Sequence, residues 1–154
     1  MRFTTALLCA MALLVGCNGE PAPRGNAAVP QEEIVQAGDA TVRATVMQTS
    51  ALGAAVAEQY GLERGEDTVM LLVGVREGPA AQEVSVPVAV TASATDLRGN
   101  RHVIEMRELH AGDLVDHVGT IRVDLPETLV FDLEIRREGA PPARVQFSRD
   151  FSAR

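Results

Sequence analysis

The chain has 154 residues, of which 46% are apolar and 23% charged, and its 14 basic and 21 acidic side chains give a net charge of −7. A length near 150 residues is typical of one domain, and this balance of residue types excludes a wholly disordered chain. Aromatic residues make up only 3% of the sequence. Few rings and an acidic charge argue against nucleic acid as a partner and against sugar clefts, which stack their ligands on aromatic side chains.

The amino terminus has the pattern of a bacterial export signal. Arg2 precedes an apolar stretch over residues 6–15, which is shorter than the roughly 20 residues that a transmembrane helix needs. The stretch ends in Leu-Val-Gly-Cys at residues 14–17, which resembles the lipobox of bacterial lipoproteins. The resemblance implies cleavage after Gly16, transfer of diacylglycerol to the thiol of Cys17 and acylation of its freed amine by a chain such as palmitate. An ordinary secretory signal with a chance cysteine is the alternative.

The residues around the cysteine also predict a compartment. Asn18 follows Cys17, whereas an aspartate there would resemble the inner-membrane retention signal, so we expect a periplasmic protein that is lipid-anchored in the outer membrane. Cys9 lies in the removed segment and Cys17 is consumed by lipid. The mature chain is therefore expected to have no free thiol and no disulfide, and its core must be held by burial alone.

The segment after the cysteine is rich in Pro, Gly, Ala and polar residues and shows no periodicity. Such composition is typical of a flexible linker. The sequence therefore predicts a signal peptide over residues 1–16, a disordered tether over 17–38 and one folded domain over 39–154.

Apolar and polar residues alternate in the predicted domain, for example over residues 40–46, 84–95 and 129–136. A period of two is typical of strands with one buried face. Residues 68–76 are apolar on both faces, which predicts a central strand. The other predicted strands are 102–109, 114–123 and 144–151. With turn residues between these segments, the sequence predicts an all-β fold: an immunoglobulin-like antiparallel β-sandwich of about seven strands.

One segment departs from this alternation. Residues 51–60 are rich in Ala and carry larger apolar residues at helical spacing. Ser50 can cap the start of a helix, and Gly61 can end it in a left-handed conformation. We expect a short helix that lies across one end of the sandwich and buries Val56 and Tyr60.

Histidine and methionine side chains in the domain raise the possibility of copper, because imidazole and thioether ligands select that metal. His102 and Met106 would share one face of their strand, but a separation of about 13 Å is too long for one metal ion. We expect scattered packing residues here and no resident cofactor or metal. The candidate ligands are Met47, Met70, His102, Met106, His110 and His117.

The sequence does not indicate an enzyme. Asp116 and His117 are adjacent on a predicted strand, so their side chains would point to opposite faces. The nucleophile motif Gly-x-Ser-x-Gly is absent from the sequence. Glu105 and Glu108 are best explained as part of a solvated strand face, since no ring platform accompanies them.

Several segments of the domain resemble the bacterial envelope family catalogued as domain of unknown function 4426. The run Ala-Ala-Val-Ala-Glu-Gln-Tyr-Gly-Leu at residues 54–62, followed by a Leu/Val strand, is the main signature, and the order and spacing agree over residues 39–151. The resemblance implies a periplasmic all-β domain and carries no activity. The other matching segments are residues 94–99, 104–109, 118–123 and 131–135.

These observations lead us to expect a membrane-anchored lipoprotein that binds another envelope protein and acts as an accessory or assembly module. Pro87 cannot donate a hydrogen bond to a neighbouring strand, so we expect a free sheet edge there, open to strand addition. The helix around Tyr60 is the second expected contact surface. The alternative is a small-ligand or metal (copper) carrier, with a pocket between the sheets or a His and Met cluster at one end. Hydrolysis of a cell-wall component is a weaker option.

Overall fold

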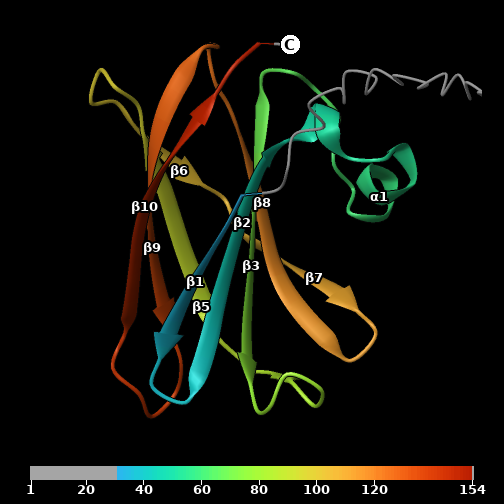
Figure 1. The fold of residues 1–154 in the computed structure, drawn as a ribbon, viewed down its shortest axis with the longest axis vertical. Helices are drawn as coiled ribbons and strands as arrows, with labels where there is room; N and C mark the ends of the chain where they lie inside the picture. Colours follow the sequence, from blue (N-terminus) through green and yellow to red (C-terminus); the bar gives the residue numbers. More distant parts are fainter. Residues whose placement is uncertain (1–30, 154) are drawn as a thin grey trace, which may run out of the picture.

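A computed structural model describes residues 31–153 and shows two antiparallel sheets packed face to face (Figure 1). This confirms the predicted immunoglobulin-like sandwich, with ten strands in the described part of the chain where about seven were predicted. The six-stranded sheet contains β1 (Gln31–Ala37), β2 (Ala40–Gln48), β3 (Thr68–Glu77), β4 (Val84–Ser85), β8 (Leu114–Arg122) and β7 (Arg107–Ala111). The four-stranded sheet contains β10 (Ala143–Phe151), β9 (Glu127–Arg136), β5 (Ala89–Thr95) and β6 (Arg101–Ile104).

The main core lies between the two sheets and follows from the alternation in the sequence. Every second residue of β2, and of β9 from Leu129 to Ile135, is buried, and the apolar ones among them belong to one cluster. Phe131 stacks on Phe147 with ring centroids 5.2 Å apart, and Phe151 contacts Phe131 edge-on with ring centroids 6.4 Å apart. Burying a Val, Leu or Phe side chain stabilises the fold by about 1.5–3 kcal/mol, so this cluster is the principal source of stability.

A second, smaller core explains why β3 is apolar on both faces. β3 pairs with β2 on one side and β8 on the other, which confirms the predicted central strand. One face of β3 joins the main core, while Met70 on the other face is 2% exposed. Met70 packs in the second core with Leu52, Ala57, Leu109 and Val118.

Helix α1 (Ala54–Gln59) covers this second core on the outer face of the six-stranded sheet, beside β3 and β8 in Figure 1. The predicted start was wrong: Gly53 is the N-cap, because residues 49–51 form a separate 3-10 turn. Gly61 ends the helix with φ +61°, as predicted. Val56 is 39% exposed and the buried helix residue is Ala57, because six residues make too few turns to bury a wide face. No helix in residues 31–153 is long and apolar enough to cross a membrane.

Two predicted strands are each divided between the sheets. Residues 84–95 form β4 in one sheet and β5 in the other, and residues 102–109 form β6 and β7. The connecting residues Val86, Val88 and Met106 also pack on the main core. The apolar pattern therefore continues where the chain passes from one sheet to the other, and the sequence does not reveal the point of change. Pro87 therefore lies in a connection between the sheets and not, as was predicted, in an edge strand.

The fold begins earlier than predicted. β1 pairs with β2 over seven residues, from Gln31 to Ala37, so the domain includes residues that were assigned to the tether. β1 is an edge strand with mostly exposed or half-buried side chains, which is why its sequence carries a weak apolar signal. The signal peptide, Cys17 and the rest of the predicted tether lie outside the described residues.

Candidate binding site beside an open sheet edge

The edge strands of the two sheets, β1 and β10, are joined at one end by Arg149. Its guanidinium Nη2 lies 3.1 Å from the Glu33 carboxylate on β1 and also approaches the carbonyl oxygen of Glu32 at 3.5 Å. The guanidinium carbon lies 4.8 Å from the centre of the Phe147 ring. The side chain is only 17% exposed. Arg149 thus bridges β10 and β1 at this end of the sandwich through an ion pair with Glu33, and it makes a cation–π contact with Phe147.

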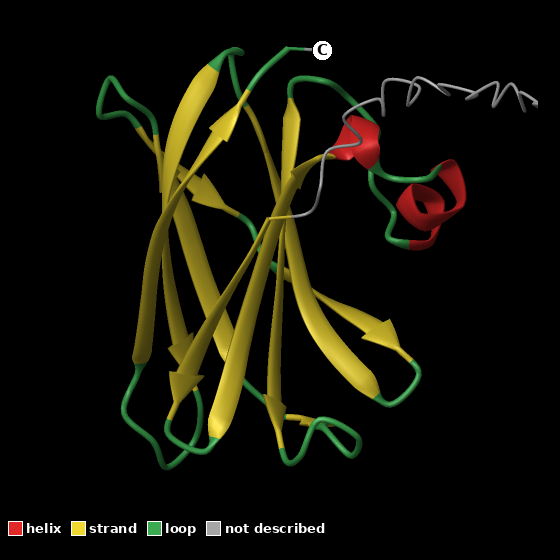
Figure 2. Cartoon of the chain, viewed as in Figure 1, coloured by secondary structure: helices red, strands yellow, loops and turns green. Residues whose placement is uncertain are grey.

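Further along β1, an apolar cleft of about 320 Å³ lies between β1, β2 and the β9–β10 loop. The turns of β1–β2 and β9–β10 lie at this same end of the sandwich (Figure 2). Val42, Val75 and Ile135 line the cleft, and each is buried in the main core. Val35 of β1, residues 140–142 of the β9–β10 loop and Ala143 of β10 also line it. Buried side chains of the main core therefore form the floor of the cleft, and Val35 with the β9–β10 loop forms its more accessible wall.

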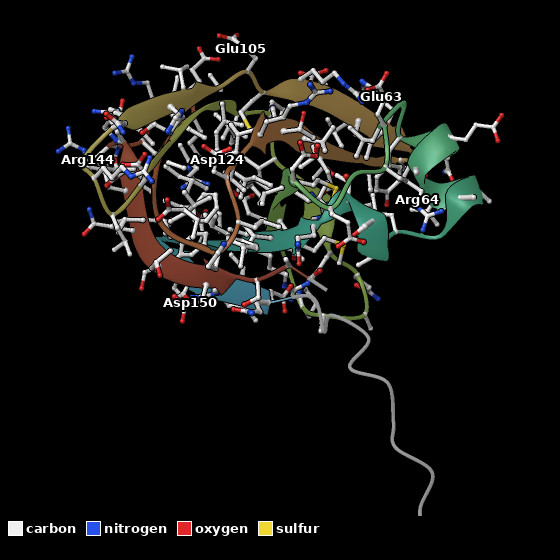
Figure 3. All side chains as sticks on the ribbon, turned by 90° about the horizontal axis from the view of Figure 1, so that it is seen from above. Glu63, Arg64, Glu105, Asp124, Arg144 and Asp150 are labelled. Atoms are coloured by element: carbon white, nitrogen blue, oxygen red, sulfur yellow. The ribbon has the colours of Figure 1, made fainter. Side chains whose placement is uncertain are left out.

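Charged residues stand at the rim of this cleft. Arg137 forms ion pairs with Asp39 and Glu77. The hydrogen bond from Arg137 lowers the pKa of the Asp39 carboxyl, and the same bond raises the pKa of Arg137. Arg144 lies at the periphery of the domain, 82% exposed, with its Nε atom 3.4 Å from the Glu134 carboxylate (Figure 3). The rim is therefore polar with both signs of charge, while the interior is apolar.

The backbone of β1 provides a second binding element. The two-residue turn at residues 38–39 makes Ala37 and Ala40 the closing pair of the β1–β2 hairpin. In an antiparallel ladder the hydrogen-bonded pairs alternate, so Glu32, Ile34 and Gln36 turn their N–H and C=O groups away from β2. No other strand in residues 31–153 pairs with this edge. The Ile34 side chain, on the outer face, is 54% exposed.

The methionines proposed as copper ligands serve as packing residues. Met47 and Met70 are opposite each other on β2 and β3 and pack in the second core. Met106 packs against the main core from the connection between β6 and β7. The sandwich therefore separates Met106 from the other two by placing them on opposite faces of the six-stranded sheet.

The histidines occupy different parts of the fold. His102 lies 3.6 Å from Asp96 beside the β5–β6 turn, whereas His110 on β7 lies 3.2 Å from Glu108. His117 is 8% exposed and pairs across strands with Glu108. The part of the chain that the structure describes contains no group of three or more His, Cys, Asp or Glu side chains placed to hold a metal ion.

The acidic residues considered for catalysis are also placed apart. Asp116 accepts a hydrogen bond from Arg76, a side chain 7% exposed that also donates to the carbonyl of Val115 at 3.0 Å. His117 follows on the same strand with the opposite parity. Glu105 is exposed in the crossing connection and does not share a strand with Glu108. The Arg76 pair ties β3 to β8.

Sequence reasoning missed both the β1 edge and the cleft. The apolar pair Ile34-Val35 was the available signal, but the acidic and amide residues around it favoured a tether. The cleft is formed by residues that are distant in sequence and meet only through the pairing of β1 with β2 and of β9 with β10.

Comparison with known proteins places this geometry among related folds. Residues 34–153 match the family described as "Domain of unknown function (DUF4426)". The structure of a DUF4426 family protein from Pseudomonas aeruginosa is similar with a TM-score of 0.68 and 27% identity, covering 80% of this chain and 96% of that one. A search of curated proteins found no significant match.

Two structures of FetP from uropathogenic Escherichia coli strain F11 are also similar. One is a copper-bound variant with a TM-score of 0.56, covering 80% of this chain and 97% of that one. The other is the as-isolated protein, with a TM-score of 0.58, covering 81% of this chain and 96% of that one. Identity is 11% in both cases, so this likeness concerns the fold alone.

Proposed function

Because the chain belongs to the DUF4426 family, whose description names no activity, we propose a function from its surface: the domain binds an extended segment of another envelope protein by adding a strand to the free edge of β1. The observation that carries this proposal is the position of the unpaired edge beside an apolar cleft. In strand addition, main-chain hydrogen bonds supply affinity and pockets for alternate side chains supply specificity.

The register of β1 defines what the added strand would present. Val35 directs its backbone groups to β2 and its side chain to the cleft. A residue opposite Val35 on the added strand would point to the same face, so an apolar side chain there would enter the cleft towards Val42 and Ile135. Burying such a side chain is worth about 1.5–3 kcal/mol. The partner segment is therefore extended, with an apolar residue at that position.

The proposed setting is the periplasm, with the domain held at the outer membrane by lipid on Cys17. The export pattern, the lipobox-like Leu-Val-Gly-Cys sequence and Asn18 support this placement. A tethered module of this kind would act as an accessory or assembly factor for its partner.

Photo-crosslinking in cells tests the strand addition. A photoreactive residue in place of Gln36, on the free edge, is expected to give one specific adduct with an envelope protein other than a second copy of this chain. The same probe in place of Leu97, 75% exposed in the β5–β6 turn, is the matched control and should not give that adduct. Equal recovery of that adduct from the two positions would contradict the proposal.

A proline substitution isolates the role of the backbone. Ile34→Pro removes an N–H that faces away from β2, so the β1–β2 ladder keeps its hydrogen bonds, and proline is tolerated on such free edges. The adduct from position 36 should disappear in Ile34→Pro and persist in Ile34→Thr. An adduct that survives the proline would show that binding does not use strand pairing.

The lipid anchor has its own test. The sequence contains no lysine, so after cleavage and N-acylation of Cys17 the mature chain would hold no primary amine. The native protein should therefore resist amine-reactive dyes, carry acyl mass in a mass spectrum and partition into detergent. Cys17→Ser should remain unlipidated and stay in the aqueous phase. Detergent partitioning identical to that of the native protein would contradict lipidation.

The cleft also favours a second candidate, a carrier of small apolar ligands. Its volume of about 320 Å³ is at the lower end of the roughly 300–1,000 Å³ of typical ligand pockets. Laurate is a suitable probe. Ala143→Leu, which fills the cleft from β10, should weaken laurate binding while Ile34→Pro leaves it unchanged. For the copper form of this candidate, titration of the protein with copper should show stoichiometric binding.

A further inference from the structure

We infer that, when no partner strand is bound, the free edge of β1 pairs with β1 of a second copy of this chain and forms a two-fold symmetric dimer. The inference rests on the proposed function in one respect, because both use the same edge. Its basis is a set of features that distinguish β1 from the other edge strands of the described structure.

Natural proteins protect sheet edges with short strands, bulges, prolines or inward charges, because an open edge is a template for another chain. β4, β6 and β7 are only two, four and five residues long, and β10 carries the inward-pointing Arg149. β1 pairs with β2 through seven consecutive residues without a bulge and contains no proline. Its inward charge, Glu33, is neutralised by Arg149. β1 is therefore the edge strand with the least protection against pairing with another chain.

The sequence of β1 is complementary to itself in the antiparallel direction. Ile34 is the middle residue of the strand, so a two-fold axis at Ile34 pairs all seven residues of one copy with those of the other. Ile34 then meets its counterpart on the outer face, where it is otherwise 54% exposed. Ile34, Gln36 and the N–H of Glu32 supply the main-chain hydrogen bonds, because these backbone groups face the free edge, whereas Arg149 Nη2 approaches the Glu32 carbonyl oxygen at 3.5 Å.

The charges agree with this register. Glu32 of one copy lies opposite Gln36 of the other, and Glu33 lies opposite Val35, so no carboxylates oppose one another. Gln36 uses one amide hydrogen to reach the Thr41 hydroxyl at 3.0 Å, which leaves the second for the Glu32 carboxylate. The dimer and the partner complex use the same backbone groups, so the partner must displace the second copy.

Disulfide trapping tests the dimer in the full-length protein. Residues opposite each other in a hydrogen-bonded antiparallel pair have Cα atoms about 5.5 Å apart, within the range that a disulfide spans. Ile34→Cys should therefore give a covalent dimer on a non-reducing gel of oxidised cells. The unsubstituted protein and Val84→Cys, 59% exposed on β4, are the controls and should remain monomeric. An Ile34→Cys dimer no more abundant than in these controls would overturn the inference.

A charge exchange tests the register. Gln36→Glu alone would set two carboxylates opposite each other at two symmetric places, and is expected to weaken self-association about tenfold. The double variant Glu32→Gln, Gln36→Glu restores a neutral partner opposite each carboxylate and should recover the dimer. Sedimentation of the detergent-solubilised proteins provides the measurement. A double variant that associates no better than Gln36→Glu would contradict the Ile34-centred pairing.

The two proposals fail in distinguishable ways. If Ile34→Cys does not trap a dimer but Ile34→Pro still removes the adduct with the partner, the dimer is wrong and the proposed function stands. If the dimer forms but the position 36 probe recovers no protein other than a second copy of this chain, the dimer stands and the proposed function is wrong.

Discussion

Gly119 shows how one residue permits the chain to pass between the sheets. It lies on β8 beneath the connection from β6 to β7, and its φ is not in the left-handed region, so space rather than conformation requires glycine here. A Cβ atom at this position would lie 2.6 Å from Ile104 Cγ2, 2.7 Å from the Glu105 carbonyl oxygen and 2.9 Å from Met106 Sδ. The backbone oxygen cannot move without shifting the connection.

We predict that Gly119→Ala destabilises the protein by about 1–3 kcal/mol, the usual cost of overpacking a core. Chemical denaturation of the purified protein measures this change. Thr120→Ala is the control: the neighbouring Thr120 side chain is exposed, so its loss should change the free energy of unfolding by less than about 1 kcal/mol. An unfolding midpoint for Gly119→Ala equal to that of the unsubstituted protein would show that the connection is not tightly packed.

Residue-level predictions were correct where local backbone geometry decides the conformation. Gly61 ends its helix in the left-handed conformation because the turn needs that backbone geometry, which the residue type indicates. The burial of Val56 was predicted wrongly, because the face that a short helix buries depends on where it docks on β3 and β8.

At the scale of elements, the main question is what holds β1 to the sandwich. Within residues 31–153, β1 pairs with β2 alone, packs Val35 and Ala37 against the main core, and is tied to β10 by the contact of Arg149 with Glu33. The tie is partly solvent-exposed, so it combines a surface ion pair of about 0–1 kcal/mol with a cation–π contact of about 0.5–1 kcal/mol.

Arg149→Met should therefore cost about 0.5–2 kcal/mol in the free energy of unfolding and increase hydrogen exchange at the β1 amides that bond to β2. Arg144→Met on the same strand is the matched control, since that side chain is 82% exposed and should change stability by less than about 0.5 kcal/mol. Unchanged exchange in β1 would show that the Arg149 contact does not help to hold the strand.

Element positions were predictable where a strand stays in one sheet. β2, β3 and β9 lie within one or two residues of their predicted ranges, because one or both faces are buried along their whole length. The strands predicted at 84–95 and 102–109 were each two strands, because crossing residues bury apolar side chains just as strand residues do.

For the whole molecule, the acidic surface sets a pH dependence of stability. Hydrogen bonds lower the pKa of Asp39 through Arg137, of Asp96 chiefly through the Asn100 side chain, and of Glu134 chiefly through Arg136. A carboxyl with a lowered folded pKa binds fewer protons than in the unfolded chain. Its stabilisation is therefore present above the unfolded pKa, near 4, and is lost as the pH falls through the folded pKa.

Thermal unfolding between pH 7 and pH 2 checks this expectation. The midpoint should change little down to about pH 5 and fall progressively below about pH 4. Asp96→Asn should begin with a lower midpoint at neutral pH and lose less on acidification, because its side chain cannot titrate. Parallel curves for the two proteins would show that Asp96 does not contribute to the acid response.

The sequence by itself determined that the chain forms two antiparallel sheets, because a period of two in apolar residues can be satisfied only by strands with buried faces. It also determined the central place of β3, since a strand that is apolar on both sides must be covered on both. Only the tertiary structure decided where the chain changes sheets, that β1 belongs to the domain, and that an apolar cleft opens beside its free edge. These features depend on contacts between residues far apart in sequence, and local periodicity does not record which segments become neighbours.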